Sequence, residues 1–248
     1  MLHLRGRREY VCKHCHRQSS VTAGRVLHHT HLPLTVWFWA VYLVARDKRG
    51  ISATQLSREL EIAYSSAWHL LHQLRKAMGQ RDQDYVLSGI VELDDAYFGA
   101  PKPNGKRCRG TEKTSALAAV SLTGQEHSRF LKIQISKLDA ESVSIVVQSI
   151  VRSGSEIHSD ALGSFRAALH KHHYQAFDKN SSALRWVHTL ISNLKSFLLG
   201  TYHGLGNKHL QSYFDEFSFR FNRRFCPDQL FPRLVAAVAA SNILGYDD

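Results

Sequence analysis

The stretch at residues 90–99, I-V-E-L-D-D-A-Y-F-G, places two adjacent carboxylates, Asp94 and Asp95, inside an apolar run. Val91 and Leu93 alternate with polar positions, which is typical of a half-buried β-strand. A carboxylate that faces a core must be paired, hydrogen-bonded or bound to a cation, because burying the bare charge is strongly unfavourable. The stretch therefore predicts either a metal-binding strand or a turn that starts at the two acids and ends at Gly99.

The charge of the chain predicts a polyanionic partner. Its 248 residues carry a formal net charge of +11 with His counted as neutral, and the pI is about 9.7, which favours nucleic acid. The chain has no apolar run long enough to cross a bilayer, and its first residues lack the apolar segment of a signal peptide. We therefore expect a cytoplasmic protein that has no membrane partner.

The first 31 residues are basic and rich in histidine, and they contain one C-x-x-C pair, Cys12 and Cys15. Such a pair on a tight turn supplies half of a tetrahedral zinc site, which needs two further ligands. In this chain those ligands could come only from the nearby histidines His3, His14, His16, His28, His29 and His31. Cys108 and Cys226 lie far away, so the cysteines do not form a disulfide framework. We expect residues 1–31 to be a partial zinc-ribbon remnant whose Zn²⁺ site is incomplete.

Residues 32–80 predict an all-α DNA-binding region. Apolar residues at spacings of three and four predict a supporting helix that starts near Leu34, Ser52 is placed to cap a short helix over 53–60, and a further helix follows over 63–78. This order is typical of a helix-turn-helix, and an ordinary three-helix packing unit is the alternative. The exposed face of the last helix would then carry the side chains that contact DNA: Tyr64, Ser65, Ser66, His69, His72 and Arg75.

Residues 79–86 are polar and predict a linker to a second unit, 87–248. Its pattern predicts three antiparallel strands within 87–136, a helix over 139–151 capped by Asp139, and a short strand over 155–159 that ends at Asp160. A helix over 161–172, a strand over 174–177 and a helix over 184–199 follow, and a last helix over 230–244 is expected in the core or an interface. This is the order of a ribonuclease H-like α/β fold, a mixed sheet with helices on both faces.

That fold brings the first and fourth strands of the unit together, and each carries an acid. Asp94 lies on the first and Asp160 ends the fourth, while strand alternation places Asp95 on the opposite face and Glu92 on the face of Asp94. Paired carboxylates suit Mg²⁺ or Mn²⁺, and two such ions support phosphoryl transfer. Asp160 alone could simply cap the next helix; its pairing with Asp94 favours the metal site.

Several longer motifs point to one family. The chain resembles the ISXO-like insertion-sequence transposases of bacteria in V-E-L-D-D-A-Y-F-G (91–99), R-G-T-E-K-T (109–114), I-H-S-D (157–160), W-V-H-T-L-I-S-N-L-K-S-F-L-L-G-T-Y-H-G (186–204), the aromatic and basic run at 208–225, and the region 10–78. The resemblance covers nearly the whole chain. It implies a DDE-type transposase that uses two Mg²⁺ or Mn²⁺ ions to cleave transposon ends and to transfer the strands into target DNA. Such a protein is expected to act as a homo-oligomer on DNA and to be associated with the bacterial nucleoid.

The resemblance also implies the site residues. The catalytic and metal-binding set falls on Asp94, Asp160 and Asn193, and the Asn makes the chain similar to a D-D-N variant, because many DDE transposases have Glu there. Glu216 is the alternative third acid, although a salt bridge with Arg220, Arg223 or Arg224 is the simpler interpretation. Phosphate contacts are expected, with solvated surface charge as the alternative, for Arg109, Lys113, His188 and Lys195.

The N-terminus departs from the family pattern. The resembled ribbon usually has two C-x-x-C knuckles, and this sequence holds only Cys12 and Cys15, so we expect an N-terminally truncated ribbon with weakened zinc binding. Two alternative functions stay open. One is a transposase-derived DNA-binding protein that no longer cuts, suggested by the missing knuckle and by Asn193. The other is a ribonuclease H-like nuclease without strand transfer.

Overall fold

The computed structural model describes residues 2–3, 9–20, 22–28, 30–99, 113–124, 127–170, 172–178, 182–202 and 205–242. The expected helices of the N-terminal half are present as α1 (Leu34–Arg46), α2 (Ala53–Leu60) and α3 (Tyr64–Gln83). The Ser52 hydroxyl caps α2 by accepting a hydrogen bond from the Gln55 N–H at 3.1 Å, as predicted. Glu61 ends α2 in the left-handed conformation (φ 52°), which makes the turn into α3 tight.

Helix α3 is longer than predicted, so the expected linker over 79–86 is wrong in its first half. The helix continues to Gln83 because its last turns pack against α7 (Leu210–Phe221) and the chain that follows it. Arg223 and Asp82 form a buried ion pair there, with Nη2 2.6 Å from Oδ1. A polar segment that has the composition of a linker is therefore helical, with Asp82 paired to a buried arginine far along the chain.

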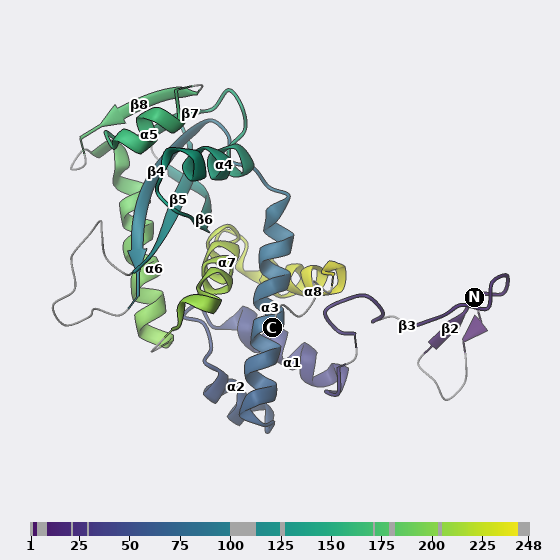
Figure 1. The fold of residues 1–248 in the computed structure, drawn as a ribbon. Helices are drawn as coiled ribbons and strands as arrows, with labels where there is room; N and C mark the ends of the chain where they lie inside the picture. The colour runs from purple at the N-terminus through teal and green to yellow at the C-terminus, as the bar shows by residue number, and fades with distance from the viewer. Residues whose placement is uncertain are drawn as a thin grey trace.

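A five-stranded mixed sheet forms the centre of the second unit (Figure 1). Its order is β6-β5-β4-β7-β8, in which β7 and β8 run parallel to β4 and the pairs β4–β5 and β5–β6 are antiparallel. The strands are β4 (Ile90–Phe98), β5 (Thr114–Thr123), β6 (His127–Ile135), β7 (Glu156–Asp160) and β8 (His173–Phe177). This topology confirms the ribonuclease H-like fold class that the element order predicts.

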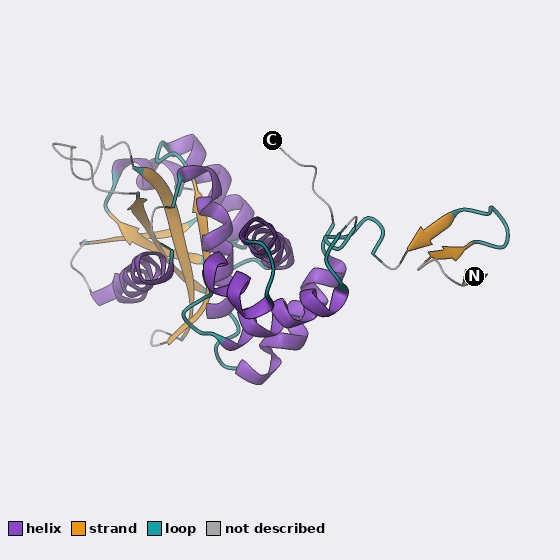
Figure 2. Ribbon diagram, turned by 90° about the horizontal axis from the view of Figure 1, so that it is seen from below, coloured by secondary structure: helices purple, strands orange, loops and turns teal. Residues whose placement is uncertain are grey.

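Helices cover both faces of the sheet (Figure 2). Helices α4 (Ala140–Ile150) and α5 (Gly163–Ala168) pack on one face, where Val91 and Leu93 share a core with Val143 and Phe165. Helices α6 (Arg185–Thr201) and α7 pack on the other, where Ala96 and Phe98 share a core with side chains of both helices, among them Leu190 and Phe214. The alternation of β4 therefore decides which side of the sheet each of its side chains serves. Asp139 caps α4 as predicted, and α5 is shorter than the expected 161–172.

The edge strand β6 is covered by amide side chains of α7. Asn222 Oδ1 accepts the Leu131 N–H at 2.7 Å, and its Nδ2 donates to the Leu131 carbonyl at 3.0 Å. At the other end of the helix, Gln211 accepts the Ile135 N–H at 2.8 Å and donates to the Ile133 carbonyl at 2.9 Å. These side chains form hydrogen bonds with the β6 backbone as a neighbouring strand would, so the edge presents fewer unpaired backbone groups.

The last helix, α8 (Leu230–Ala240), lies in the core of the helical part, one of the two positions predicted for it. Its buried face contributes Leu234, Ala237 and Val238 to a cluster with Trp37 of α1 and Leu74 of α3. The helical core thus uses segments from both sides of the predicted boundary between 32–80 and 87–248, and that division stays a prediction.

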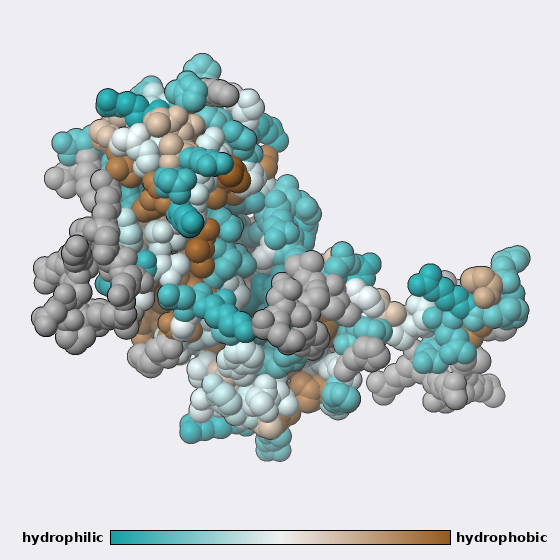
Figure 3. Space-filling model, viewed as in Figure 1, coloured by the Kyte–Doolittle hydropathy of each residue, from teal (hydrophilic) through white to brown (hydrophobic). Residues whose placement is uncertain are grey.

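The surface of the molecule is mostly hydrophilic where Figure 3 shows it, with apolar residues in small groups.

A small separate antiparallel sheet near the N-terminus contains β1 (Leu2–His3), β2 (Glu9–Val11) and β3 (Gln18–Ser20). Within the described part of the chain, no helix combines the length and the apolar character that a membrane span needs.

Candidate metal centre

The two predicted acids lie side by side at the middle of the sheet. In the parallel pair β4–β7, Leu93 is opposite Ser159, so Asp94 and Asp160 are the next residue on each strand. Both are buried, with 6% and 7% of their surface exposed. Asp160 does not cap α5, whose N-cap is Leu162; it ends β7, and its Oδ1 accepts the Leu162 N–H at 3.3 Å. The metal interpretation of the strand is thus favoured over the turn.

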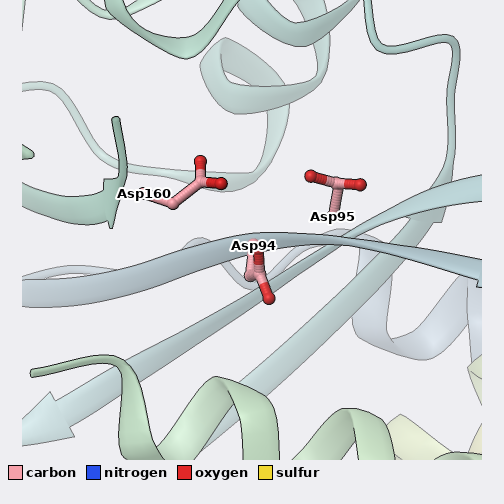
Figure 4. A group of neighbouring side chains, drawn as sticks. All are labelled: Asp94, Asp95 and Asp160. Atoms are coloured by element: carbon pink, nitrogen blue, oxygen red, sulfur yellow. The ribbon is translucent and has the colours of Figure 1, made fainter. Parts of the chain in front are cut away.

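A third carboxylate, that of Asp95, joins them. Figure 4 shows the Asp94 and Asp95 side chains leaving β4 on opposite sides, as strand alternation predicts. One oxygen of each of Asp94, Asp95 and Asp160 nevertheless lies within 4.8 Å of those of the other two. The sequence did not predict this, because alternation alone does not show that Asp160 ends its strand beside both.

The negatively charged carboxylates of this acidic cluster repel one another. Burial raises the pKa of Asp94 to about 6, and the negative charges of Asp95 and Asp160 act in the same direction, while His188 lowers it. A bound divalent cation would relieve that repulsion, and carboxylate oxygens are the ligands that Mg²⁺ and Mn²⁺ prefer. The residues present therefore fit a divalent metal ion.

His188 of α6 contacts one residue of this cluster, Asp94. Its Nε2 lies 3.2 Å from Asp94 Oδ2, and about a third of its side chain is exposed. It is the fourth residue of α6, so this helix begins beside Asp94. The sequence suggested only a phosphate contact for His188, since nothing local shows which flank of the helix faces Asp94.

Asn193 takes a different place on the same helix. It follows His188 by five residues, which is a rotation of about 140° on an α-helix, and it is exposed. Lys195 follows His188 by seven residues, about 20° from it, and its Nζ lies 5.8 Å from the ring centroid of Phe98 on β4. The flank of α6 that faces β4 thus carries His188 and Lys195, and Asn193 lies on the other flank.

Glu92 anchors the start of α6. It lies two residues before Asp94 on the same face of β4, is 2% exposed, and accepts the Val187 N–H at 2.7 Å. Burial raises the pKa of Glu92 to about 7, and hydrogen bonds from the backbone N–H groups of Val187 and Trp186 oppose that rise. The sequence placed Glu92 on the face of Asp94 and left its role open.

The residues expected to contact DNA differ in how exposed they are. Tyr64, Ser65 and His69 are exposed on the first turns of α3, and Ser66 is half-buried there. Lys113 is half-buried just before β5, and Arg109 lies outside the described residues. The expectation that His72 and Arg75 are exposed on α3 is wrong, because these residues are only 7% and 2% exposed.

Arg75 is buried because it serves an ion-pair network. Its Nε lies 2.8 Å from Glu216 Oε2, and its guanidinium carbon lies 4.0 Å from the ring centroid of Tyr213 and 5.1 Å from that of Tyr202. Arg220 pairs with the other oxygen of Glu216 at 2.8 Å. Glu216 is therefore engaged by two arginines, as the salt-bridge interpretation predicts, and Arg75 is the partner that the sequence did not reveal.

The cysteine pair lies in the turn between β2 and β3. The His16 N–H donates to the Cys12 carbonyl at 3.0 Å, and the Cys12 N–H donates to the Arg17 carbonyl at 3.0 Å. Hydrogen bonds from the Cys15 and His14 backbone lower the pKa of the Cys12 thiol. Among the residues that the structure describes, the acidic cluster is the one group of three or more His, Cys, Asp or Glu near enough to hold a metal.

Comparison with known proteins places this site in a family. The model of the ISXO2-like transposase domain matches residues 86–222, which is more than half of the chain and includes the strands and helices of the acidic cluster. The chain belongs to the ISXO2-like transposase family. The sequence-based resemblance to ISXO-like transposases is thereby confirmed.

The chain is similar in sequence to a known protein and in fold to solved structures. It is 28% identical over 116 residues to an uncharacterized protein in transposable element ISH50 of Halobacterium salinarum, a match that covers 47% of this chain and only 37% of that protein. Among solved structures, it is similar to the catalytic core domain of BIV integrase, with 14% identity, a TM-score of 0.36, and coverage of 52% of this chain and 81% of that one. For the Mos1 strand transfer complex the values are 12%, 0.34, 88% and 82%.

Proposed function

We propose that this ISXO2-like transposase is a DNA transposase that cleaves transposon ends and transfers them into target DNA at the acidic cluster on β4 and β7. The observation that supports the proposal is the approach of Asp94, Asp95 and Asp160 to within 4.8 Å on adjacent parallel strands of the family's domain. Burying the Asp94 and Asp160 carboxylates together, with the half-buried Asp95 close by, is unfavourable without a cation, so a structural role for the cluster explains it poorly.

Asp94 and Asp160 would hold two Mg²⁺ or Mn²⁺ ions, with a third ligand from α6. Such ions supply activation of a hydroxyl nucleophile and neutralisation of the leaving oxygen in an in-line phosphoryl transfer. The distance of 3.2 Å between His188 and Asp94 supports His188 as the third ligand, in preference to the Asn193 that the resemblance implies. Asp95, from the opposite face, adds negative charge to the site.

The exposed first turns of α3 would contact DNA through Tyr64, Ser65, Ser66 and His69, with the protein acting as a homo-oligomer on DNA. Lys195 lies on the metal side of α6 and suits a phosphate near the reacting strand, and Arg109 and Lys113 have the charge for further phosphates. We retain Zn²⁺ at Cys12 and Cys15 as part of the proposal, with two ligands still to be identified.

The test uses the full chain, DNA that carries the ends of its own element, and Mn²⁺. Asp94→Ala and Asp160→Ala should each abolish end cleavage and joining while leaving DNA binding intact, and Asp228→Ala, which removes an exposed carboxylate from a distant turn, should change none of them. Cleavage that survives both cluster substitutions would contradict the proposal. Cleavage without joining would favour a nuclease, and binding without cleavage would favour a DNA-binding relic.

A further inference from the structure

Glu92 is a buried carboxylate next to the acidic cluster that takes no part in it. It lies on the same face of β4 as Asp94, two residues earlier, which is roughly 7 Å along a strand. Its carboxylate is not in the group that gathers at Asp160 among the residues described. It points instead to the start of α6, where its Oε2 meets the Val187 N–H at 2.7 Å.

The start of α6 needs such a partner. The first N–H groups of any α-helix lack a partner within the helix, and a side chain at the N-cap usually accepts one of them. The N-cap of α6 is Leu184, whose side chain has no acceptor. Glu92, 95 positions earlier in the chain, accepts hydrogen bonds from Val187 and Trp186, the third and second residues of the helix. It therefore caps α6 from the neighbouring strand.

Capping from β4 has a consequence for the metal centre, because the next residue of α6 is His188. The two residues of one strand face meet two consecutive residues of one helix turn: Glu92 meets Val187, and Asp94 meets His188 at 3.2 Å. The first contact uses a backbone group, so it fixes the helix itself. The second uses a side chain whose position depends on where the helix begins.

We propose that Glu92 is a positioning residue that holds the first turn of α6 against β4 and thereby places the His188 imidazole beside Asp94. The inference rests on the proposed function only in that His188 acts there on a metal ion. If Glu92 is removed, the N–H groups of Val187 and Trp186 lose their acceptor, the first turn of α6 frays, and His188 is no longer held beside Asp94.

Three variants of the full chain test this. Glu92→Ala removes the acceptor and the charge, Glu92→Gln keeps an acceptor oxygen without the charge, and Leu198→Ala opens a cavity at the far end of α6 as a control for lost stability. Mn²⁺ affinity is measured by calorimetric titration. Broadening of the His188 imidazole resonance by Mn²⁺ reports its distance from the ion, and hydrogen exchange of the Val187 amide reports the cap.

We expect Glu92→Ala to lower Mn²⁺ affinity by about 10-fold to 100-fold, the usual cost of losing a residue that orients a ligand. The broadening of His188 should weaken, and the Val187 amide should exchange faster. Glu92→Gln should restore most of the affinity. Leu198→Ala should lower the melting temperature and leave the Mn²⁺ affinity and the Val187 amide unchanged.

Two outcomes would overturn the inference. If Glu92→Ala lowers only the melting temperature, as Leu198→Ala does, Glu92 is merely structural. If Glu92→Gln loses as much affinity as Glu92→Ala, the charge of Glu92 acts on the ion and its position does not matter. Absence of Mn²⁺ binding in the wild-type protein would instead contradict the proposed function, and the exchange rate of the Val187 amide would still decide whether Glu92 holds α6.

Discussion

The imidazole of His188 lies 3.2 Å from the carboxylate of Asp94, measured from Nε2 to Oδ2. The two residues come from α6 and β4 and are 94 positions apart in the chain, since 188 − 94 = 94. Their contact brings a second type of metal-binding side chain, an imidazole, next to Asp94 at the place where α6 begins. This contact and the other buried polar contacts of the fold can each be tested by substitution.

The first consequence concerns the third ligand. His188→Ala should lower Mn²⁺ affinity and Mn²⁺-dependent end cleavage by at least about 10-fold. Removing even a residue that only orients a metal ligand typically lowers metal affinity by about that factor. Asn193→Ala should change both only slightly, because Asn193 is exposed on the other flank of α6. Parallel titrations and cleavage assays of the two variants decide the matter. A greater loss in Asn193→Ala would restore the D-D-N assignment.

The ion-pair network of Glu216 should matter for stability and not for metal binding. Glu216→Ala leaves Arg75 and Arg220 without their carboxylate, and Arg75 is 2% exposed, so we expect the free energy of unfolding to fall by about 3–5 kcal/mol. Urea unfolding measures this, with exposed Asp228→Ala as the control. Mn²⁺ affinity at a temperature where the variant is folded should match the wild type; a large loss there would return Glu216 to the metal site.

Asp215 should make stability depend on pH. Burial raises its pKa from 3.8 to about 6, and its carboxylate packs so close to Gly79 that a Cβ there would lie 2.5 Å from Oδ2. The folded state therefore binds this proton more tightly than the unfolded state, so the contribution of Asp215 to stability is greatest below about pH 4 and is lost as the pH rises through 6.

Asp215→Asn removes that loss, and the variant should gain about 1–3 kcal/mol over the wild type at about pH 8 and less at about pH 5. Urea unfolding at the two pH values measures the gain. The exposed Asp84→Asn, at the end of α3, is the matched control and should show the same small effect at both. A gain for Asp215→Asn that is equal at both pH values would refute the assignment of the raised pKa to this group.

The cover on the sheet edge should be visible in hydrogen exchange. Asn222→Ala removes the acceptor of the Leu131 N–H and the donor to its carbonyl, which should cost about 1–3 kcal/mol and speed exchange of the Leu131 amide. Gln134→Ala, an exposed position on the same strand, should leave that amide protected. Unchanged protection in Asn222→Ala would mean that α7 does not hold the edge through this side chain.

Much of this fold could be predicted from sequence because the signals are local. Ser52 and Asp139 cap helices within three residues of themselves, and the alternation of β4 fixes which of its side chains share a face. Asp94 and Asp160 could be paired because the order of strands and helices predicts a parallel contact between β4 and β7.

The remaining features depend on contacts between distant segments. Arg75 looks like an exposed residue of an amphipathic helix until Glu216, 141 positions later, is placed against it. Residues 79–83 have the polar composition of a linker, and the ion pair that Asp82 forms with Arg223 cannot be seen from the local sequence. His188 and Asn193 cannot be told apart without knowing which flank of α6 faces β4. Each of these three features thus concerns a polar side chain whose partner has no signal nearby in the sequence.

The central claim is that Asp94 and Asp160 form a divalent metal site, and calorimetric titration of the full chain with Mn²⁺ tests it most directly. The wild-type protein and Asp228→Ala should bind two ions, and Asp94→Ala and Asp160→Ala should each lose that binding while keeping the circular dichroism of the folded chain. An absence of Mn²⁺ binding by the wild-type protein, or binding that is unchanged in both cluster variants, would contradict the claim.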